Sequence, residues 1–434
     1  MNKLTNKLKK FWKSLGPGLI VGAADNDPSG IATYSIAGAK FGLAALWTAI
    51  ATLPFMIITQ RMAGRIGLIS GKGLAGNMKK YYPRWVLLSI AFLILGANII
   101  NIGADISAMS AASKVLMPSI SPILTSILIS GFITFLLIIV SYRSMVKYLK
   151  WVAIVMLAYV FAAFFVEQNW KEILLRAVVP KFILNKEYLM MIIAIFGTTI
   201  SPYLFFWQAS ETVEEEKQYN KENPKSAVMI PATGPHIKHR EQRIIKNEIG
   251  SMYKDVRFGM VFSNLITFFI IVLCSSTLFR SGMTNITTIE EIASALEPLA
   301  GHYSNLLFLI GLLASGALAI PVLAGSAAYI IAELFNWRWG FANKFHRARE
   351  FYMIMVIATV LGIAIPFFNL HPVQILFYTA VIYGVISPAL VFLLIHMANN
   401  PKIMGQYTSR PLSNFIAYTL FLIMAFSSIL MLLL

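Results

Sequence analysis

The sequence predicts an all-α, polytopic membrane protein, and three observations support this fold class. The chain has 434 residues, of which 58% are hydrophobic and only 13% are charged, and soluble domains carry about twice that share of charge. Apolar runs of roughly 20 residues recur, which is the helix length that crosses a ~30 Å hydrocarbon core. The basic residues are concentrated in alternate loops, as the positive-inside rule requires of a multi-pass protein.

Eleven stretches are apolar and long enough to be predicted as membrane spans. Their approximate ranges are 17–37, 43–64, 86–113, 121–141, 149–166, 188–209, 258–278, 303–332, 351–368, 373–396 and 412–434. The chain has a single cysteine, which excludes a disulfide within the chain and any metal cage built from several cysteines.

The distribution of Lys and Arg predicts the orientation of the chain in a cytoplasmic membrane. If the N-terminus is cytoplasmic, 29 of the 36 basic residues fall on the cytoplasmic side and 7 fall outside. The net charge of +17 is then a consequence of topology, and nucleic-acid binding need not be invoked. An odd number of spans places the C-terminus outside.

Two proline-broken motifs inside apolar stretches are the strongest functional signal. They are Asp27-Pro28-Ser29-Gly30 and Thr198-Thr199-Ile200-Ser201-Pro202-Tyr203. Proline removes a backbone donor from a helix, and carbonyls freed in this way are tolerated in hydrocarbon only where they line a polar cavity. Matching interruptions in two halves of a membrane chain indicate a transport site near the bilayer midplane.

The two breaks divide the chain into two sets of five spans. Residues 17–166 form the first predicted five-helix repeat, and residues 188–396 form the second. Because five is odd, the second set enters the membrane from the opposite side, as in the inverted repeats of secondary transporters. Residues 1–16 are a predicted cytoplasmic N-terminus and 412–434 an accessory eleventh helix. The hydrophilic segment 211–257 is predicted to be a cytoplasmic loop with a short amphipathic helix from about His236 to Tyr253.

Three carboxylates lie well inside predicted spans, and intramembrane charges are functional candidates because burying them is costly. Asp27 belongs to the first break, and Asp25 precedes it, either facing an outer vestibule or packing against a helix. Asn98, Asn101 and Asp105 share one helix face, because their spacings are three and four. A polar stripe of this kind either forms hydrogen bonds between helices or lines a hydrated path for ions. The carboxylate of Asp105 favours the second interpretation.

The second break offers only oxygen ligands. The carbonyls of Thr198 and Thr199 and the hydroxyl of Ser201 are donors that suit hard cations such as Mg²⁺. Transition metals gain more from sulfur or imidazole, and neither break contains either. The six histidines all lie in loops or at span ends. The combination predicts a site for a hard divalent cation.

Over nearly its whole length the chain resembles the NRAMP divalent-metal transporters. The first break, preceded by Gly16-Pro17-Gly18, is similar to the family's G-P-G and D-P-G-N, and residues 197–203 are similar to the sixth-span pattern that ends in M-P-H. Gln60 with Arg61 and Arg65 is similar to the end of the second span of the family, and Gly103-Ala104-Asp105-Ile106 to its third. This resemblance implies a LeuT-like fold of 5+5 inverted repeats with broken helices 1 and 6.

The departures from the family pattern indicate a different ion. Asp27 keeps the family's metal carboxylate, but Gly30 stands at the position of a ligating Asn. Ser201 stands at the position of the Met whose thioether favours transition metals. Small residues at both positions imply a wider, oxygen-only site, which suits Mg²⁺ because this ion dehydrates reluctantly. The pattern resembles the NRAMP-related magnesium transporter branch.

Three other departures put proton coupling in doubt. Tyr203 replaces the motif His, Gln208 falls at a second family His, and Ala108 sits at the position of a third-span Glu found in proton-coupled members. The predicted function is therefore uptake of Mg²⁺, and also Mn²⁺, without proton coupling. Asp27, Gly30, Thr198 and Ser201 would form the ion site, with Asn98, Asn101, Asp105, Tyr203 and Gln208 around it or along the path, and with Pro28 and Pro202 breaking the helices.

Several alternatives remain at this point. A proton-coupled Mn²⁺/Fe²⁺ importer of the ordinary NRAMP type is the main one, with Asp27 and Asp105 carrying protons. A Na⁺-coupled symporter of organic solutes is a further possibility on the same fold. No enzyme is predicted, because no H-E-x-x-H, phosphate-cradling glycine loop or nucleophile–base spacing lies within the spans. We expect the lipid bilayer and the transported ion as partners, no nucleic acid, no cofactor and a monomer.

Overall fold

The structure is a computed structural model, and it describes residues 17–116, 118–139, 155–222, 239–368 and 370–433. Within these ranges every regular element is a helix, and no strand is present. The prediction of an all-α protein is therefore confirmed. The predicted cytoplasmic N-terminus, 1–16, lies outside the described residues, as do parts of the fifth span and of the hydrophilic segment.

The helices of the first half include both parts of the first broken span. They are α2 (Pro17–Ala24), α3 (Pro28–Phe41), η1 (Gly42–Ala45), α4 (Trp47–Ser70), α5 (Leu74–Tyr81), α6 (Arg84–Leu116), α7 (Pro122–Ile139), an apolar helix at Val155–Phe164, and α9 (Trp170–Val178). The surface helix α9 was not among the predicted elements.

The helices of the second half begin with the second broken span. They are α10 (Lys186–Thr199), α11 (Pro202–Glu222), α12 (His239–Cys274), η3 (Ser275–Phe279), α13 (Ile289–Ser294), α14 (Glu297–Ala300), η4 (Gly301–Tyr303), α15 (Ser304–Phe335), η5 (Phe345–Arg347), α16 (Arg349–Gly362), η6 (Ile365–Phe368), α17 (Pro372–Asn399), α18 (Pro401–Met404) and α19 (Pro411–Leu433).

Eight helical segments in the described residues are long and apolar enough to cross a membrane. They correspond to eight of the eleven predicted spans. The predicted first span corresponds to α2 with α3, and the predicted second span corresponds to α4. Helices α3 and α4 meet at a bend of 104°, and it is as a pair that they are long and apolar enough to cross a membrane. The fifth predicted span begins outside the described residues, and its described part is the short helix Val155–Phe164.

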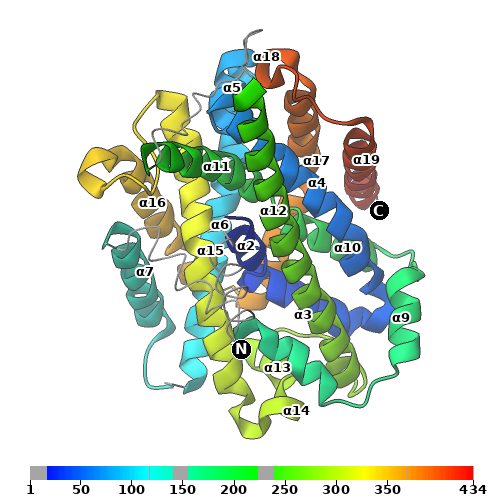
Figure 1. Cartoon of the computed structure of the whole chain (residues 1–434). Coiled ribbons are helices and arrows are strands. Elements are labelled where there is room, and N and C mark those ends of the chain that lie inside the picture. The colour runs from blue at the N-terminus through cyan, green and yellow to red at the C-terminus, as the bar shows by residue number, and fades with distance from the viewer. Residues whose placement is uncertain (1–16, 117, 140–154, 223–238, 369, 434) are drawn as a thin grey trace, which may run out of the picture.

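The long helices run between two ends of the molecule. In Figure 1, α5 and α18 lie at one end, and α13 and α14 lie at the opposite end. The broken helices lie inside this bundle, where α2 packs on α12, and α3 packs on α10, α12 and α17. Every described side chain of α3 from Pro28 to Ser35 is buried, so the first break is enclosed by protein.

Close approach of helix backbones is made possible by glycine. A Cβ atom added at Gly22 of α2 would lie 2.1 Å from the Gly259 carbonyl oxygen of α12. A Cβ atom at Gly197 of α10 would lie 2.1 Å from the Ala380 carbonyl oxygen of α17. Small residues let helices approach in membranes, where burial of apolar surface from water does not drive their association. Both broken spans are thus seated directly on a neighbouring backbone.

Polar caps define the start of α10, the first half of the second broken span. The Asn185 side chain accepts a hydrogen bond of 2.7 Å from the Tyr188 N–H, which satisfies one of the free donors at a helix N-terminus.

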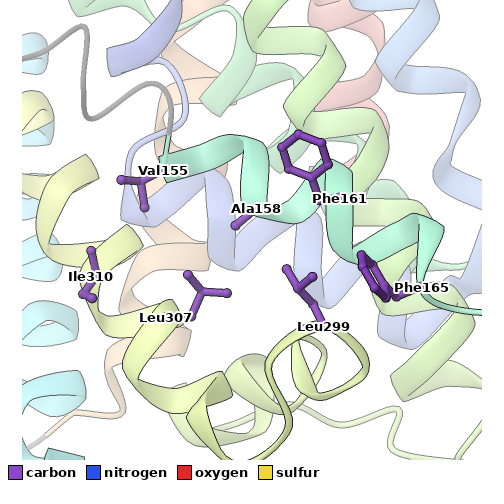
Figure 2. A pocket seen from close by; sticks show the side chains of 7 residues that line it. All are labelled: Val155, Ala158, Phe161, Phe165, Leu299, Leu307 and Ile310. Carbon is purple, nitrogen blue, oxygen red and sulfur yellow. The ribbon is translucent and has the colours of Figure 1, made fainter.

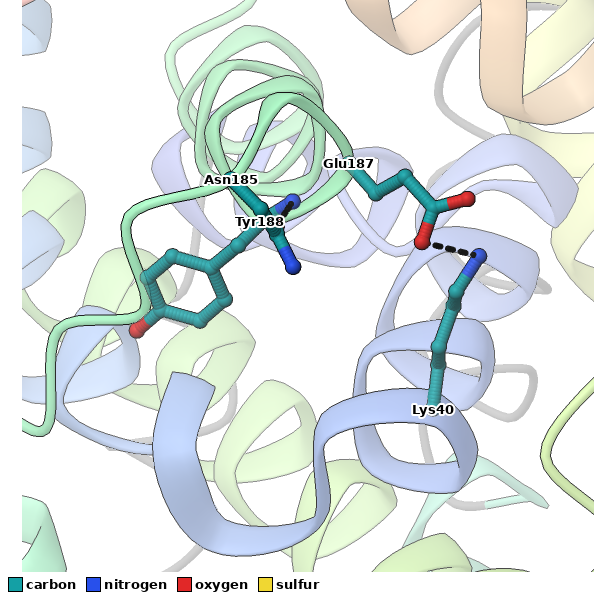
Figure 3. Close-up of polar contacts among 4 residues, drawn as sticks. All are labelled: Lys40, Asn185, Glu187 and Tyr188. Atoms are coloured by element: carbon teal, nitrogen blue, oxygen red, sulfur yellow. Dashed lines mark hydrogen bonds and ion pairs between the residues drawn. The ribbon is translucent and has the colours of Figure 1, made fainter.

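Lys40 at the end of α3 forms an ion pair of 3.0 Å with Glu187 (Figure 3). Both partners are partly exposed, so the pair contributes little stability.

The hydrophilic segment 211–257 is more helical than predicted. Helix α11 continues to Glu222, and α12 already begins at His239 and runs into the span without interruption. The amphipathic helix predicted from about His236 to Tyr253 is therefore the first part of α12 instead of a separate element. Only residues 223–238 of this segment lie outside the described ranges.

Apolar surface on the outside of the bundle fits a hydrocarbon environment. Helix α7 exposes Leu128, Phe132 and Phe135 by 57% or more of each side chain, a pattern that a water-soluble surface avoids. An apolar cavity of about 530 Å³ opens between the short helix Val155–Phe164 and the start of α15. Figure 2 shows the side chains that line it, among them Phe161 and Leu307.

Candidate functional site

Asp27 lies at the centre of the candidate site, as the N-cap residue of α3. Its backbone is extended (φ −66°, ψ 171°) and Pro28 follows as the first helical residue. Its Oδ1 accepts a hydrogen bond of 2.6 Å from the Gly30 N–H, and its Oδ2 accepts one of 3.0 Å from Asn101 Nδ2 on α6. The side chain is 2% exposed. Both oxygens are therefore held, and each keeps a lone-pair direction for a further partner.

The second break exposes backbone oxygens between α10 and α11. The Ser201 hydroxyl is 2.5 Å from the Thr198 carbonyl oxygen and 3.1 Å from that of Gly197. The Ile200 carbonyl accepts a hydrogen bond of 3.1 Å from Ser387 on α17. Thr198 and Ser201 are both buried, and the carbonyls of Thr198 and Ile200 each have a hydroxyl partner within the protein, as a membrane interior favours.

The two breaks lie against each other. The hydroxyl groups of Tyr34 on α3 and Thr199 are 2.9 Å apart. A Cβ atom at Gly30 would lie 3.3 Å from Thr198 Oγ1, so these two predicted ligand positions are neighbours. The Tyr203 hydroxyl donates to the Ala24 carbonyl at 3.5 Å, which joins the start of α11 to the end of α2.

Two more buried carboxylates surround Asp27. Asp105 on α6 is fully buried and neither of its oxygens has a hydrogen-bond partner among the described residues. Asp25 is also fully buried, and its Oδ2 accepts a hydrogen bond of 2.5 Å from Ser263 on α12. Asp25 therefore packs against a helix, which decides between the two placements that the sequence left open.

The charges of these groups act on one another. Asp27 interacts electrostatically with both Asp25 and Asp105. No ion pair in the described part of the chain joins any of the three to a Lys or Arg. Buried carboxyl groups without a basic partner are candidates for binding a cation, because burying an unpaired charge is costly.

The polar stripe of α6 meets a second stripe on α17 that the sequence analysis missed. Thr379 donates to Asn101 Oδ1 at 2.9 Å, and Tyr383 donates to Asn98 Oδ1 at 2.8 Å. Ser387 completes the second stripe. The three α17 residues are spaced four apart, so the same helix-face argument that identified the α6 stripe would have found them.

Asn98 and Gln208, which were predicted to lie around the ion site or along its path, have hydrogen-bond partners outside the two break motifs. Asn98 Nδ2 donates to Ser326 of α15 at 2.8 Å, so its amide joins α6 to α15 and α17. Gln208 Nε2 donates to Thr212 at 3.1 Å and faces Gly64 of α4. The structure thus shows interhelical hydrogen bonds for Asn98, whereas Asn101 donates directly to Asp27.

The candidate ligands at the two helix breaks are all oxygen atoms. The described residues contain no group of three or more His, Cys, Asp and Glu side chains placed to hold one metal ion. The three carboxylates therefore do not form a single direct cage. An ion here would have Asp27 as its carboxylate ligand, with water between it and the remaining oxygens, an arrangement that Mg²⁺ commonly adopts.

Comparison with known proteins identifies the family. The family described as natural resistance-associated macrophage protein-like, NRAMP, matches residues 18–434. The chain is similar to the divalent metal cation transporter MntH of Caldanaerobacter subterraneus, with 24% identity over 94% of this chain and 89% of the relative. It is also similar to the MntH of Klebsiella pneumoniae, with 24% identity over 90% of this chain and 87% of the relative.

Solved structures agree on the fold. The manganese transporter of Eremococcus coleocola superposes with a TM-score of 0.77 at 15% identity, covering 97% of this chain and 87% of that one. Mhp1 in its inward-facing conformation superposes with a TM-score of 0.57 at 11% identity, covering 96% and 89%. The predicted LeuT-like fold is confirmed. With a family match that spans all but its first residues, the chain belongs to the NRAMP family.

Proposed function

We propose that the protein carries divalent metal cations, chiefly Mg²⁺ and also Mn²⁺, into the cell without coupling to protons. The observation that carries this proposal is the buried Asp27 carboxylate at a helix break that faces a second break. The names of the relatives, divalent metal cation transporters, support the class of substrate. The choice of Mg²⁺ rests on this chain's own residues.

The preference for Mg²⁺ follows from the size and chemistry of the site. Gly30 offers no side chain, and Ser201 offers a hydroxyl where the family pattern has a thioether. Mg²⁺ takes oxygen ligands in octahedral geometry and usually keeps several waters. Soft ligands, which favour transition metals, are missing from both break motifs. A site in which Asp27 is the only carboxylate that contacts the ion directly leaves room for a partly hydrated ion.

The absence of coupling is inferred from substituted positions. Tyr203 and Gln208 stand where the family pattern has histidines, and Ala108, which is fully buried, stands at the position of a glutamate. Neither tyrosine nor glutamine exchanges a proton readily near neutral pH. Uptake would then follow the ion's electrochemical gradient, and an inside-negative potential contributes about 2.3 kcal/mol per charge for each 100 mV.

One observation favours the alternative, a proton-coupled Mn²⁺/Fe²⁺ importer. Both oxygens of Asp105 lack a hydrogen-bond partner among the described residues. A buried carboxyl group in that condition is a candidate proton carrier. The two functions differ in whether uptake acidifies the interior, so one assay separates them.

The test is ion uptake into proteoliposomes that contain an Mg²⁺-sensitive dye, with a pH dye in parallel vesicles. We expect Mg²⁺ entry without acidification. Mn²⁺ entry with acidification and no Mg²⁺ signal would establish the alternative instead.

Asp27→Asn is the matched variant for the ion site. Asparagine is as good an N-cap as aspartate, so this change removes the ligand charge and preserves the start of α3. We expect uptake to be lost by Asp27→Asn and by Asp27→Ala. Uptake near the wild-type rate by either variant, in protein that remains monodisperse, would refute the site assignment.

A further inference from the structure

We propose that Thr379 and Ser29 are positioning residues, which fix the orientation of the Asp27 carboxylate through the Asn101 amide. The proposal rests on the proposed function, because it takes Asp27 as the ion ligand. Thr379 belongs to α17, Asn101 to α6 and Ser29 to α3, so the contacts join three helices. All four side chains are buried, with at most 2% exposed.

The Asn101 amide is the central link. Its Nδ2 donates to Asp27 Oδ2 at 3.0 Å, and its Oδ1 accepts from Thr379 Oγ1 at 2.9 Å. The two ends of an amide differ, since one end donates and the other accepts. A hydroxyl proton directed at Oδ1 therefore holds the NH₂ group toward the carboxylate, and the reversed amide would place its oxygen against a negative charge.

The hydroxyl of Thr379 has one proton and two acceptors within reach. Besides Asn101 Oδ1, it lies 2.7 Å from the Leu376 carbonyl of its own helix. The Ser29 hydroxyl donates to this same carbonyl at 3.3 Å. Because Ser29 supplies Leu376 with a donor, the proton of Thr379 is available to Asn101. A ring then runs from the first break to Leu376, along the backbone of α17 to Thr379, and through Asn101 of α6 back to Asp27.

This ring gives a role to a residue that the ion site itself does not use. Ser29 stands beside Asp27 in the motif Asp27-Pro28-Ser29-Gly30, and its side chain points to α17. With Gly30 N–H on Oδ1 and Asn101 on Oδ2, the carboxylate is held at both oxygens. A ligand fixed in this way binds an ion of strict geometry without being ordered first.

The consequence is an effect on ion affinity instead of on turnover. Without the Thr379 proton, only Asp27 orients the Asn101 amide, and the hydrogen bond on Asp27 Oδ2 is held less firmly. A buried hydrogen bond contributes about 0.5–1.5 kcal/mol. We therefore expect Thr379→Val, which keeps the shape of the side chain, to raise the KM for Mg²⁺ by about three- to tenfold and to leave the maximal rate near that of the wild type.

Thr379→Ser is the matched control, because it keeps the hydroxyl and removes only a methyl group. It should restore the KM to within about twofold of the wild type, given the small energy of the missing contact. A wild-type KM for Thr379→Val would overturn the proposal. Equal impairment of the Val and Ser variants would also overturn it, because packing alone would then explain the loss. If Thr379→Val is not monodisperse, Thr379→Ala removes the same hydroxyl with less bulk and is judged by the same criteria.

The role of Ser29 is tested by a double-mutant cycle. Ser29→Ala alone should raise the KM for Mg²⁺ less than Thr379→Val does, since the Thr379 proton is then shared with Leu376. The double variant should be no worse than Thr379→Val alone, because coupled residues are not additive. Strictly additive effects would contradict the ring.

The assay distinguishes failure of this inference from failure of the proposed function. Asp27→Asn is measured in the same vesicles. If Asp27→Asn transports normally, the ion site itself is wrong. If Asp27→Asn is inactive while Thr379→Val matches the wild type, the site stands and only the positioning role is rejected.

Discussion

Asp27 performs two tasks that usually belong to different residues. As an N-cap it accepts the Gly30 N–H at 2.6 Å, and a carboxylate there is stabilised by the positive end of the helix dipole. As a buried charge without a described ion-pair partner, it is costly unless something compensates it. In the function proposed above, a bound cation would supply that compensation, so Asp27 would be stabilised most fully when the site is occupied.

At the residue scale, the width of the proposed ion site predicts its preference between Mg²⁺ and Mn²⁺. Ser201→Met introduces a thioether next to the Thr198 carbonyl, and soft ligands favour Mn²⁺ over Mg²⁺. We expect competition between the two ions in the vesicle assay to shift toward Mn²⁺ in Ser201→Met, and further in combination with Gly30→Asn. A Cβ atom at position 30 would lie 3.0 Å from the Asp25 carbonyl oxygen, so the second change requires a small shift of the break.

Ser201→Ala serves as the control for this prediction. It removes the hydroxyl without adding sulfur, so it separates loss of an oxygen donor from gain of a thioether. Unchanged competition between Mg²⁺ and Mn²⁺ in both Met-containing variants would count against the argument from size and ligand softness.

At the scale of elements, the breaks depend on how closely neighbouring helices approach. Gly197 precedes Thr198 on α10 and meets the backbone of α17 at Ala380 and Gly384. The Ser387 hydroxyl then reaches the Ile200 carbonyl one turn further along. Helix α17 therefore packs directly against α10 and also provides a hydroxyl donor for the Ile200 carbonyl at the break.

Gly197→Ala should destabilise the protein strongly. Its Cβ atom would lie 2.1 Å from the Ala380 carbonyl oxygen and 2.3 Å from the Gly384 nitrogen, and overpacking of this kind typically costs about 1–3 kcal/mol or more. The measurement is thermal unfolding of the purified protein in detergent, where we expect a clear fall in the melting temperature.

Gly131→Ala is the matched control on α7, where an added Cβ atom meets nothing within 4 Å. Alanine has the higher helix propensity, so this variant should melt at or above the wild-type temperature. Equal melting temperatures for both variants would show that the α10–α17 contact is looser than the structure indicates.

At the scale of the whole molecule, two carboxylates join helix ends near α5. Glu214 of α11 accepts hydrogen bonds from the N–H groups of Phe341 and Ala342, at 3.0 and 2.9 Å. Glu333 of α15 accepts from the N–H groups of Gly73 and Gly76, at 2.6 and 2.8 Å. Hydrogen bonds to charged acceptors are among the stronger ones, so this end of the bundle is firmly connected.

The orientation of the molecule in the membrane is a prediction at the same scale. The basic residues place α18 in the cytoplasm and α13 outside, and these two helices lie at opposite ends of the bundle (Figure 1). The single cysteine, Cys274, is buried, so new surface cysteines can be labelled without removing it. We expect a membrane-impermeant thiol reagent to label Glu290→Cys in intact cells, and Lys402→Cys only after permeabilisation. The reverse pattern would invert the predicted topology.

The class of fold and the location of the two helix breaks followed from the amino-acid sequence alone. Hydropathy and charge asymmetry suffice for the class of fold, because a membrane restricts the chain to helices of fixed length. Local chemistry located both breaks as well, since a proline inside an apolar span must be accommodated by its surroundings. Asp27, Thr198 and Ser201 were found in this way, and the structure places the two breaks against each other.

The partners of the polar side chains around Asp27 came from the packing of the helices. Asn98 and Asn101 share one helix face, yet Asn101 holds Asp27 whereas Asn98 joins α15 and α17. Asp25 was placed against Ser263 of α12, and Thr379 was added from a helix about 280 residues away in sequence. Periodicity states which face a residue occupies, but its partner depends on how distant helices pack, and one sequence read alone carries no record of that packing.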